Sequence, residues 1–169
     1  MKDGWAQTVL GPVDAADLGI PLAHDHVLMD GSFMYVDPPA SVDQHFADEQ
    51  ITLDNRGWVA YHWTSSHHNV HLDSEDVAIA ELQRFVAAGG RTVVDPTNKG
   101  LGRDPGPLAR IAKATGSHII MGSGYYLGGT HPDDMSDRAM DSIAEEIMAD
   151  IQVGIGNTDV KAGLIGEIG

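Results

Sequence analysis

Two histidines separated by one residue offer the clearest chemistry in this sequence. His24 and His26 flank Asp25 at the end of an apolar segment, and in a β-strand residues i and i+2 point to the same face. Both imidazoles are therefore expected to converge, and two neutral imidazoles about 2.0 to 2.1 Å from a zinc-like ion would supply half of a tetrahedral shell. The alternative is a pair of histidines satisfied by backbone carbonyls. Asp25 is expected to point to the opposite face.

A carboxylate inside another apolar segment is the third candidate ligand. Glu167 lies within Leu164–Ile168, where an unpaired buried charge costs several kcal/mol. A divalent cation is a suitable partner, because one carboxylate can bridge two cations. An ion pair with arginine or lysine is the alternative. The chain has no cysteine, so any metal must be held by histidine, aspartate or glutamate.

The elements that would position these residues are short apolar segments that alternate with amphipathic ones. Such alternation predicts βα units around a parallel sheet, whose strands are apolar on both faces. Four strands are expected. They are a first strand ending near Pro21 to Leu28, then Arg91–Asp95, His118–Gly122 and approximately Val160–Ile168.

Three helices are expected between these strands. One begins with Ser74 and turns Val77, Leu82, Phe85 and Val86 inward. The next is capped by Asp104, has Pro105 at its first position and ends at Gly116. For the last helix Ser136 is the expected cap, and its apolar stripe is Met140, Ile143, Ile147, Met148 and Ile151.

The stretch from Gly31 to Asp73 is less regular, and a long loop over one end of the sheet is expected there. Loops of this kind on a rigid scaffold often build substrate pockets. Four of the histidines in this stretch have a spacing that matches no recurrent metal motif, and surface positions are expected for them. They are His62, His67, His68 and His71.

Composition excludes several classes of function. The formal charge of −15 opposes binding to a phosphate backbone, so nucleic acid is not expected as a partner. No uncharged apolar run approaches about 18 residues, so neither secretion nor membrane insertion is expected, and the interpretation is a cytoplasmic protein. Residues 1–169 are expected to form a single domain, because no linker divides them.

Several motifs, taken in order, resemble the N-terminal half of the phosphotriesterase family, in the amidohydrolase superfamily. The resemblance covers nearly the whole chain. Its motifs are Thr8–Pro12, Leu18–Gly19, His24–His26, Gly90–Asp95, Gly100–Pro105, Met121–Tyr126 and Lys161–Gly169.

The resemblance implies a (β/α)8 TIM barrel with two divalent metal ions, in which His24 and His26 bind the buried ion. The family's bridging ligand is a carboxylated lysine or a glutamate, and here the matching residue is Glu167. That glutamate points to the phosphotriesterase-related branch more than to the lysine-bearing phosphotriesterases and lactonases. Zinc is the first candidate metal, and manganese, cobalt and iron accept the same ligands. Tyr126, with Tyr125 beside it, matches a position near the substrate pocket of some lactonases, although packing at the barrel end is an equal alternative.

The implied function is a metal-dependent hydrolase acting on a small-molecule ester, lactone, amide or phosphoester. Only the first four βα steps are present, and the family's remaining ligands, two histidines and a catalytic aspartate, belong to later strands. The chain is therefore expected to be incomplete and to show little or no activity alone. Two alternatives remain: a non-catalytic half barrel whose open sheet edges make it a homo-oligomer, or one structural metal ion in another α/β fold.

Overall fold

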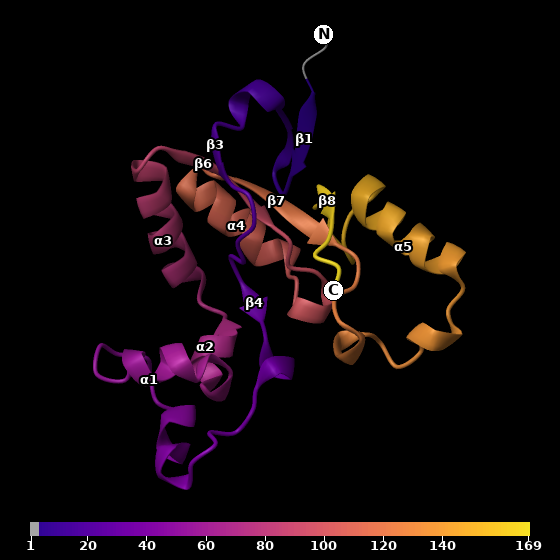
Figure 1. Ribbon diagram of the computed structural model, residues 1–169. Coiled ribbons are helices and arrows are strands. Elements are labelled where there is room, and N and C mark those ends of the chain that lie inside the picture. The colour runs from indigo at the N-terminus through magenta and orange to yellow at the C-terminus, as the bar shows by residue number, and fades with distance from the viewer. Residues whose placement is uncertain (1–3) are drawn as a thin grey trace.

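A four-stranded parallel sheet, with strand order β3-β6-β7-β8, carries the fold (Figure 1). The structure is a computed structural model that describes residues 4–169. The strands are β3 (Ile20–Leu22), β6 (Gly90–Asp95), β7 (His118–Ser123) and β8 (Leu164–Ile165). The helices α3 (Glu75–Ala87), α4 (Pro105–Thr115) and α5 (Met140–Gln152) connect successive strands. The expected order of four βα steps is confirmed.

The two central strands agree with the sequence prediction to within one residue at each end. Their parallel register pairs Val93 with Ile119 and Asp95 with Met121, and the apolar members of these pairs are completely buried. The helix-covered face of the sheet holds the core, in which Val93 and Met121 join Leu108 and Ile111 of α4. Leu82 of α3 completes the same cluster.

The two outer strands are shorter than predicted. β3 ends at Leu22, so His24 and His26 follow the strand, and β8 ends at Ile165, so Glu167 also lies beyond it. Both strands are at the edges of the sheet, where each has one neighbour to hydrogen-bond with. Pairing on one side alone leaves the strand ends free to turn.

Capping residues define α3 and α4 as the sequence predicts. The Ser74 side chain accepts a hydrogen bond from the Val77 amide, and the Asp104 side chain accepts one from the Gly106 amide. Helix α4 then ends at Gly116, whose φ of 71° is left-handed. Local sequence chemistry therefore sets these helix ends.

Other details of α3 and α5 differ from the prediction. Ser136 lies in a separate 3-10 turn, and Ala139 precedes α5 without a side-chain cap. Met140 and Met148 are 86% and 52% exposed, and Val77 of α3 is 61% exposed. The apolar stripe of α5 is wider than the surface that the sheet offers it, so only part of the stripe is covered. Ile151 is the member packed against the core cluster.

Two segments outside the sheet contain strands and helices that the sequence analysis did not predict. An antiparallel hairpin, β1 (Trp5–Thr8) and β2 (Gly11–Asp14), docks on β7 through a hydrogen bond from the Val9 amide to the Ile119 carbonyl. The stretch from 31 to 73 is not a plain loop. It contains α1 (Arg56–Tyr61) and α2 (His67–Val70), and β4 (Met29–Asp30) pairs with β5 (His71–Leu72) at its two ends.

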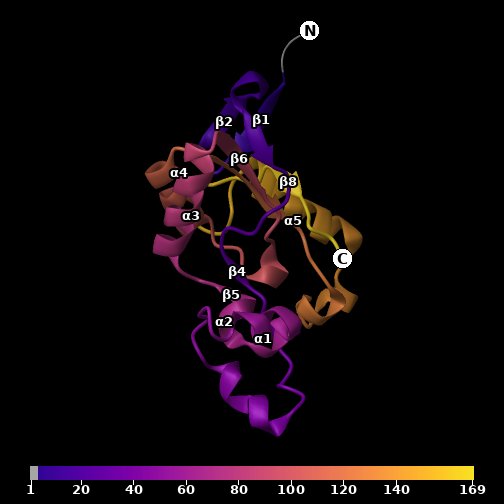
Figure 2. The ribbon, with the colours of Figure 1, turned by 60° about the vertical axis from the view of Figure 1, so that its left-hand side comes forward.

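This stretch, here called the arm (residues 31–73), projects beyond the sheet on the side where the parallel strands end (Figures 1 and 2). Short 3-10 helices complete the chain: η1 (Ala15–Asp17), η2 (Ser32–Met34), η3 (Ser41–Ala47), η4 (Trp63–Ser65), η5 (Lys99–Leu101), η6 (Gly128–Thr130) and η7 (Met135–Asp137). None of the helices between residues 4 and 169 has the length and apolar character needed to cross a membrane.

Candidate metal centre

The three predicted ligands come together where the sheet's carboxyl ends meet. His24 Nε2 lies 2.7 Å from Glu167 Oε2, and the His24 and His26 rings are 5.5 Å apart, almost perpendicular. One ligand atom from each of the three residues lies within 4.8 Å of the others. Among residues 4–169 this is the single group of three or more such side chains with that geometry. The side chains therefore converge as expected, but they do so from residues that follow the strands and not from residues within them.

Contacts behind His26 hold its ring. The His26 Nδ1 atom lies 2.8 Å from Thr97 Oγ1, and the Thr97 hydroxyl in turn donates to the Asp95 carboxylate. Asp95 and Thr97 are both completely buried. Burial raises the pKa of Asp95, although hydrogen bonds from Thr97 and the charge of His26 act in the opposite direction. With Nδ1 engaged, Nε2 is the His26 nitrogen left for a metal.

Glu167 is fixed through its main chain. Its amide donates to the Pro96 carbonyl at 2.8 Å, and the buried Asn98 side chain donates to the Glu167 carbonyl. The preceding amide, of Gly166, donates to Ser123 at the end of β7. The side chain keeps 20% exposure, so it is less buried than the sequence implied. Within residues 4–169 its ion-pair partner is His24 and not an arginine or lysine.

Tyr126 touches the centre directly. A hydrogen bond to the Glu167 carboxylate raises the pKa of the Tyr126 phenol, and burial and the charge of Glu167 raise it further. The phenol therefore stays protonated at neutral pH. Its ring packs edge-to-face on Phe33 from the arm, with centroids 6.0 Å apart. Tyr126 thus links the candidate ligands to the arm.

The neighbouring Tyr125 is engaged elsewhere. Its hydroxyl donates to Glu146 of α5 at 2.8 Å and accepts from Arg138 at 2.6 Å, and Lys99 lies 5.4 Å from its ring centroid. Glu146 also pairs with Lys99 and Arg138. These contacts give Tyr125 a packing role, and substrate contact by this residue stays a prediction.

Arg103, which the resemblance includes in a motif, is structural. Its guanidinium donates to Asp150 Oδ2 at 2.8 Å and to the Gly122 carbonyl at 3.0 Å, and Ser123 also donates to Asp150. Arg103 and Asp150 are only 3% and 10% exposed at their side chains. The pair therefore joins the loop after β6 to α5 beneath the centre.

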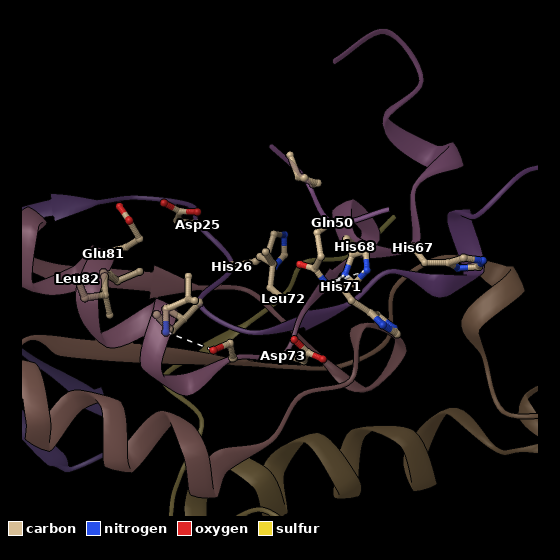
Figure 3. A pocket seen from close by; sticks show the side chains of 16 residues that line it. Asp25, His26, Gln50, His67, His68, His71, Leu72, Asp73, Glu81 and Leu82 are labelled. Carbon is tan, nitrogen blue, oxygen red and sulfur yellow. Dashed lines mark hydrogen bonds between the residues drawn. The ribbon is translucent and has the colours of Figure 1, made fainter. Parts of the chain in front are cut away.

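A pocket of about 730 Å³ adjoins His26 at the open edge of β3. Figure 3 shows His26 between Asp25 and Glu81 on one side and Gln50, His68 and His71 of the arm on the other. The arm histidines have other partners: His67 with Asp48, His68 with Gln50, and His71 with Asp30 and Ser32. His67, His68 and His71 are exposed and His62 is partly so, in agreement with the surface positions expected for them.

Comparison with known proteins identifies the family. The model of the phosphotriesterase family matches residues 4–169, and the chain belongs to that family. It is 38% identical over 167 residues to an N-acetyltaurine hydrolase from Tetraodon nigroviridis and 36% identical to the human protein of the same name. It is 35% identical to a phosphotriesterase-related protein from Nematostella vectensis. Each match covers 98% or more of this chain and 48 to 49% of the relative, so the chain spans about half their length.

Solved structures agree with this assignment. A resiniferatoxin-binding protein from Rhodobacter sphaeroides superposes with a TM-score of 0.93 at 39% identity, over 97% of this chain and 46% of that one. A Deinococcus radiodurans lactonase gives 0.66 at 26% identity, over 95% and 44%. The expected fold class is confirmed: the parallel sheet is half of a barrel, which excludes the alternative of an unrelated α/β fold.

Sequence reasoning missed the groups behind the ligands. The sequence prediction assigned Asp95 only to a strand and a motif and gave Thr97 no role, yet both residues lie against His26. A signal was present, because Asp95 is a carboxylate at the end of an apolar strand, as unusual there as Glu167. The positioning of Glu167 by Asn98 had no comparable signal.

Proposed function

We propose that this chain carries the first half of the active centre of a metal-dependent hydrolase, with His24, His26 and Glu167 as metal ligands. The observation that carries the proposal is the approach of His24 Nε2 to Glu167 Oε2 at 2.7 Å, with His26 in the same group. Two imidazoles and a carboxylate are the donor set of many catalytic zinc sites, which keep one position open for water or substrate.

The residues present fit a divalent ion. Glu167 has no arginine or lysine paired with it within residues 4–169, and two neutral imidazoles leave a partly buried carboxylate without full compensation. When bound, a divalent ion acidifies a water molecule to a pKa of about 7 and polarises the substrate's carbonyl or phosphoryl oxygen. Two ions and zinc as the metal are further parts of this proposal, supported by family membership.

The chain's own residues would set the geometry of that reaction. His24 and His26 present nitrogen lone pairs, and Glu167 supplies the negative charge that favours a cation. Tyr126 lies beside Glu167, whose carboxylate raises the pKa of the phenol further above neutral. It lies between the ligands and Phe33 of the arm, so we propose it as a residue that contacts substrate. The catalytic proton acceptor is expected in a different part of the family's barrel.

An amide is the substrate class with the most support. The relatives named N-acetyltaurine hydrolase match at 30 to 38% identity, whereas the lactonase structure matches at 26%. A glutamate at position 167, where lactonases of the family have a carboxylated lysine, favours the same branch. Esters, lactones and phosphoesters use the same metal-activated water and remain the comparison substrates.

Metal binding by the purified chain tests the proposal. We expect the chain to bind zinc, measured by competition with a chromophoric chelator, and we expect His24→Ala and Glu167→Gln to abolish tight binding. His68→Ala is the matched control, because His68 is exposed and its one hydrogen-bond partner among residues 4–169 is Gln50. Absence of zinc binding, or equal binding by Glu167→Gln, would reject the metal centre.

Hydrolysis assays with N-acetyltaurine, a lactone and a phosphotriester would then rank the substrates. The sequence predicts little turnover by the chain alone, because the group holds three of the six ligands that the resemblance implies. Zinc-dependent turnover by the purified chain would contradict that prediction, and it would also show directly which class is preferred.

A second candidate role is self-association, which the open edges of the sheet favour. β3 and β8 each have one neighbouring strand, and the accessible surface is 9857 Å². A compact protein of 18.0 kDa exposes about 8,000 Å², and the excess on each copy is larger than the about 800 Å² that each partner buries in a standard stable interface. We expect light scattering to give the mass of two copies, and a monomer at all concentrations would contradict this role.

A further inference from the structure

The contacts behind His26 form a directed chain of hydrogen bonds. Asp95 ends β6 and accepts from three groups: the Thr97 hydroxyl, the Thr97 amide at 3.0 Å and the Val27 amide at 3.4 Å. Val27 follows His26 directly, so Asp95 ties both the ring and the backbone of this segment to the sheet. The Asp95 Oδ1 atom itself lies 4.0 Å from His26 Nδ1, which leaves Thr97 as the link between them.

The direction of these bonds follows from the number of protons. A threonine hydroxyl carries one proton but two lone pairs. The Asp95 carboxylate can only accept, and it lies nearer to the hydroxyl than the Leu28 carbonyl, which is 3.3 Å away. The Thr97 proton therefore goes to Asp95. Thr97 Oγ1 must then accept from His26, so the proton of the neutral His26 ring lies on Nδ1.

His24 provides the contrast within the same centre. Its side chain is 58% exposed and its one polar contact among residues 4–169 is Glu167. His26 is 20% exposed and is held from behind by two completely buried residues. Of the two candidate ligands, only His26 is pre-oriented by the fold.

We infer that Thr97 and Asp95 are positioning residues that hold His26 in the Nδ1-protonated tautomer, with the Nε2 lone pair directed to the metal. The inference rests on the proposed metal centre. Outer groups of this kind raise the basicity of a histidine ligand and fix its ring, and their loss typically lowers metal affinity about 10- to 100-fold. Thr97 transmits the effect, because Asp95 lies too far from Nδ1 for a direct hydrogen bond.

Zinc affinity of three variants tests the inference. Thr97→Val keeps the shape of the side chain but removes the hydroxyl, and we expect the affinity of the chain for zinc to fall about 10- to 100-fold. Thr97→Ser restores the hydroxyl and should recover most of that loss. Thr92→Val is the matched control. Thr92 lies in β6 and is buried like Thr97, but its hydroxyl donates to the Leu18 carbonyl. This variant should leave zinc affinity unchanged.

A second measurement needs no metal. The nitrogen chemical shifts of histidine rings distinguish the two neutral tautomers by NMR, and free histidine favours the Nε2-protonated form. In the metal-free chain at pH 8, the His26 ring should be protonated on Nδ1, and Thr97→Val should shift it toward the Nε2-protonated form. His68, which is exposed, serves as the internal reference.

The outcomes separate this inference from the proposed function. If the chain binds zinc and Thr97→Val binds it equally well, the positioning role is overturned while the metal centre stands. If His26 carries its proton on Nε2 in the metal-free chain, the inference is also overturned. If the chain does not bind zinc, the metal centre and the inference built on it both fail.

Discussion

The helix-covered face of the sheet and the arm are stabilised in different ways. At this face, Val93 and Ile119 of the sheet and Ile111 of α4 are completely buried and belong to one core cluster. In the arm, Leu53 and Tyr61 are 87% and 88% exposed, and the segment is held by stacked rings such as Phe46 on Trp58, 4.7 Å apart, and by short-range hydrogen bonds. The difference indicates that the sheet sets global stability, whereas the arm can change with modest effect on it.

The candidate metal centre lies at the border between these two regions. His26 and Glu167 are anchored to the sheet through Thr97 and Pro96, while Tyr126 reaches the arm through Phe33. The sheet thus positions the candidate ligands, and under the proposed function the less densely packed arm would lie on the side from which substrate approaches. This division is typical of enzymes whose loops select the substrate on a constant scaffold.

The largest effect is expected from the buried ion pair beneath the centre. Arg103→Met should destabilise the chain by about 3 to 5 kcal/mol, because it leaves Asp150 buried without its cation. The free energy of unfolding in urea measures this. Arg84→Met is the control, since Arg84 pairs with Glu81 at an exposed position and should change little. Equal losses of stability in the two variants would contradict the prediction that the buried ion pair matters more than the exposed one.

Apolar truncation tests the comparison itself. Leu108 is 1% exposed in the core, and Leu53 is 87% exposed in the arm. Leu108→Ala should cost about 3 kcal/mol, through lost burial and a residual cavity, whereas Leu53→Ala should stay within about 0.5 kcal/mol. Urea midpoints for both variants give the answer. A large loss from Leu53→Ala would mean that the arm contributes a core of its own.

A smaller effect is expected at the start of α4. Asp104→Ala removes the side chain that accepts from the Gly106 amide, and should cost about 1 kcal/mol. Asp104→Asn can make the same hydrogen bond and should recover most of the stability. Thermal unfolding followed by circular dichroism detects the difference. An unchanged midpoint for Asp104→Ala would mean that the Asp104 side chain does not stabilise the start of α4.

The smallest effect is a local one in the arm. Hydrogen bonds from Ser32 and His71, together with the charge of His71, lower the pKa of Asp30 to about 2, despite an opposing effect of burial. A lowered folded-state pKa stabilises the structure above the unfolded value of about 3.9, and that stabilisation is lost as pH falls toward 2. The protection factors of the β4–β5 amides, which correct for the intrinsic exchange rate at each pH, should therefore fall as pH is lowered from about 4 to about 2.

Asp30→Asn is the control for this window. It should remove the pH dependence between about pH 4 and pH 2, while exchange in β6 and β7 stays slow in both proteins. If β6 and β7 lose protection together with β4 and β5, the arm and the sheet unfold as one unit and the proposed difference between them is wrong.

Much of the fold was predictable because its signals are local. The central strands are short apolar runs, and α4 begins at Asp104 with Pro105 and ends at Gly116, as capping chemistry requires. The candidate ligands His24, His26 and Glu167 were also proposed from the sequence, through residue type, apolar surroundings and family resemblance, and the structure brings the three side chains together. Residue type and apolar surroundings belong to a residue and its near neighbours, and the resemblance combines several such local motifs along the chain.

Tertiary structure alone decided the rest. The exposure of Met140 and Val77 depends on how much of each helix the sheet covers, which helical periodicity does not contain. The bond from His26 to Thr97 joins residues 71 positions apart, and the choice of partner for Glu167 depends on which strand ends meet. Such contacts depend on the packing of the whole sheet, because a side chain's spacing in sequence sets its direction but not what lies opposite it.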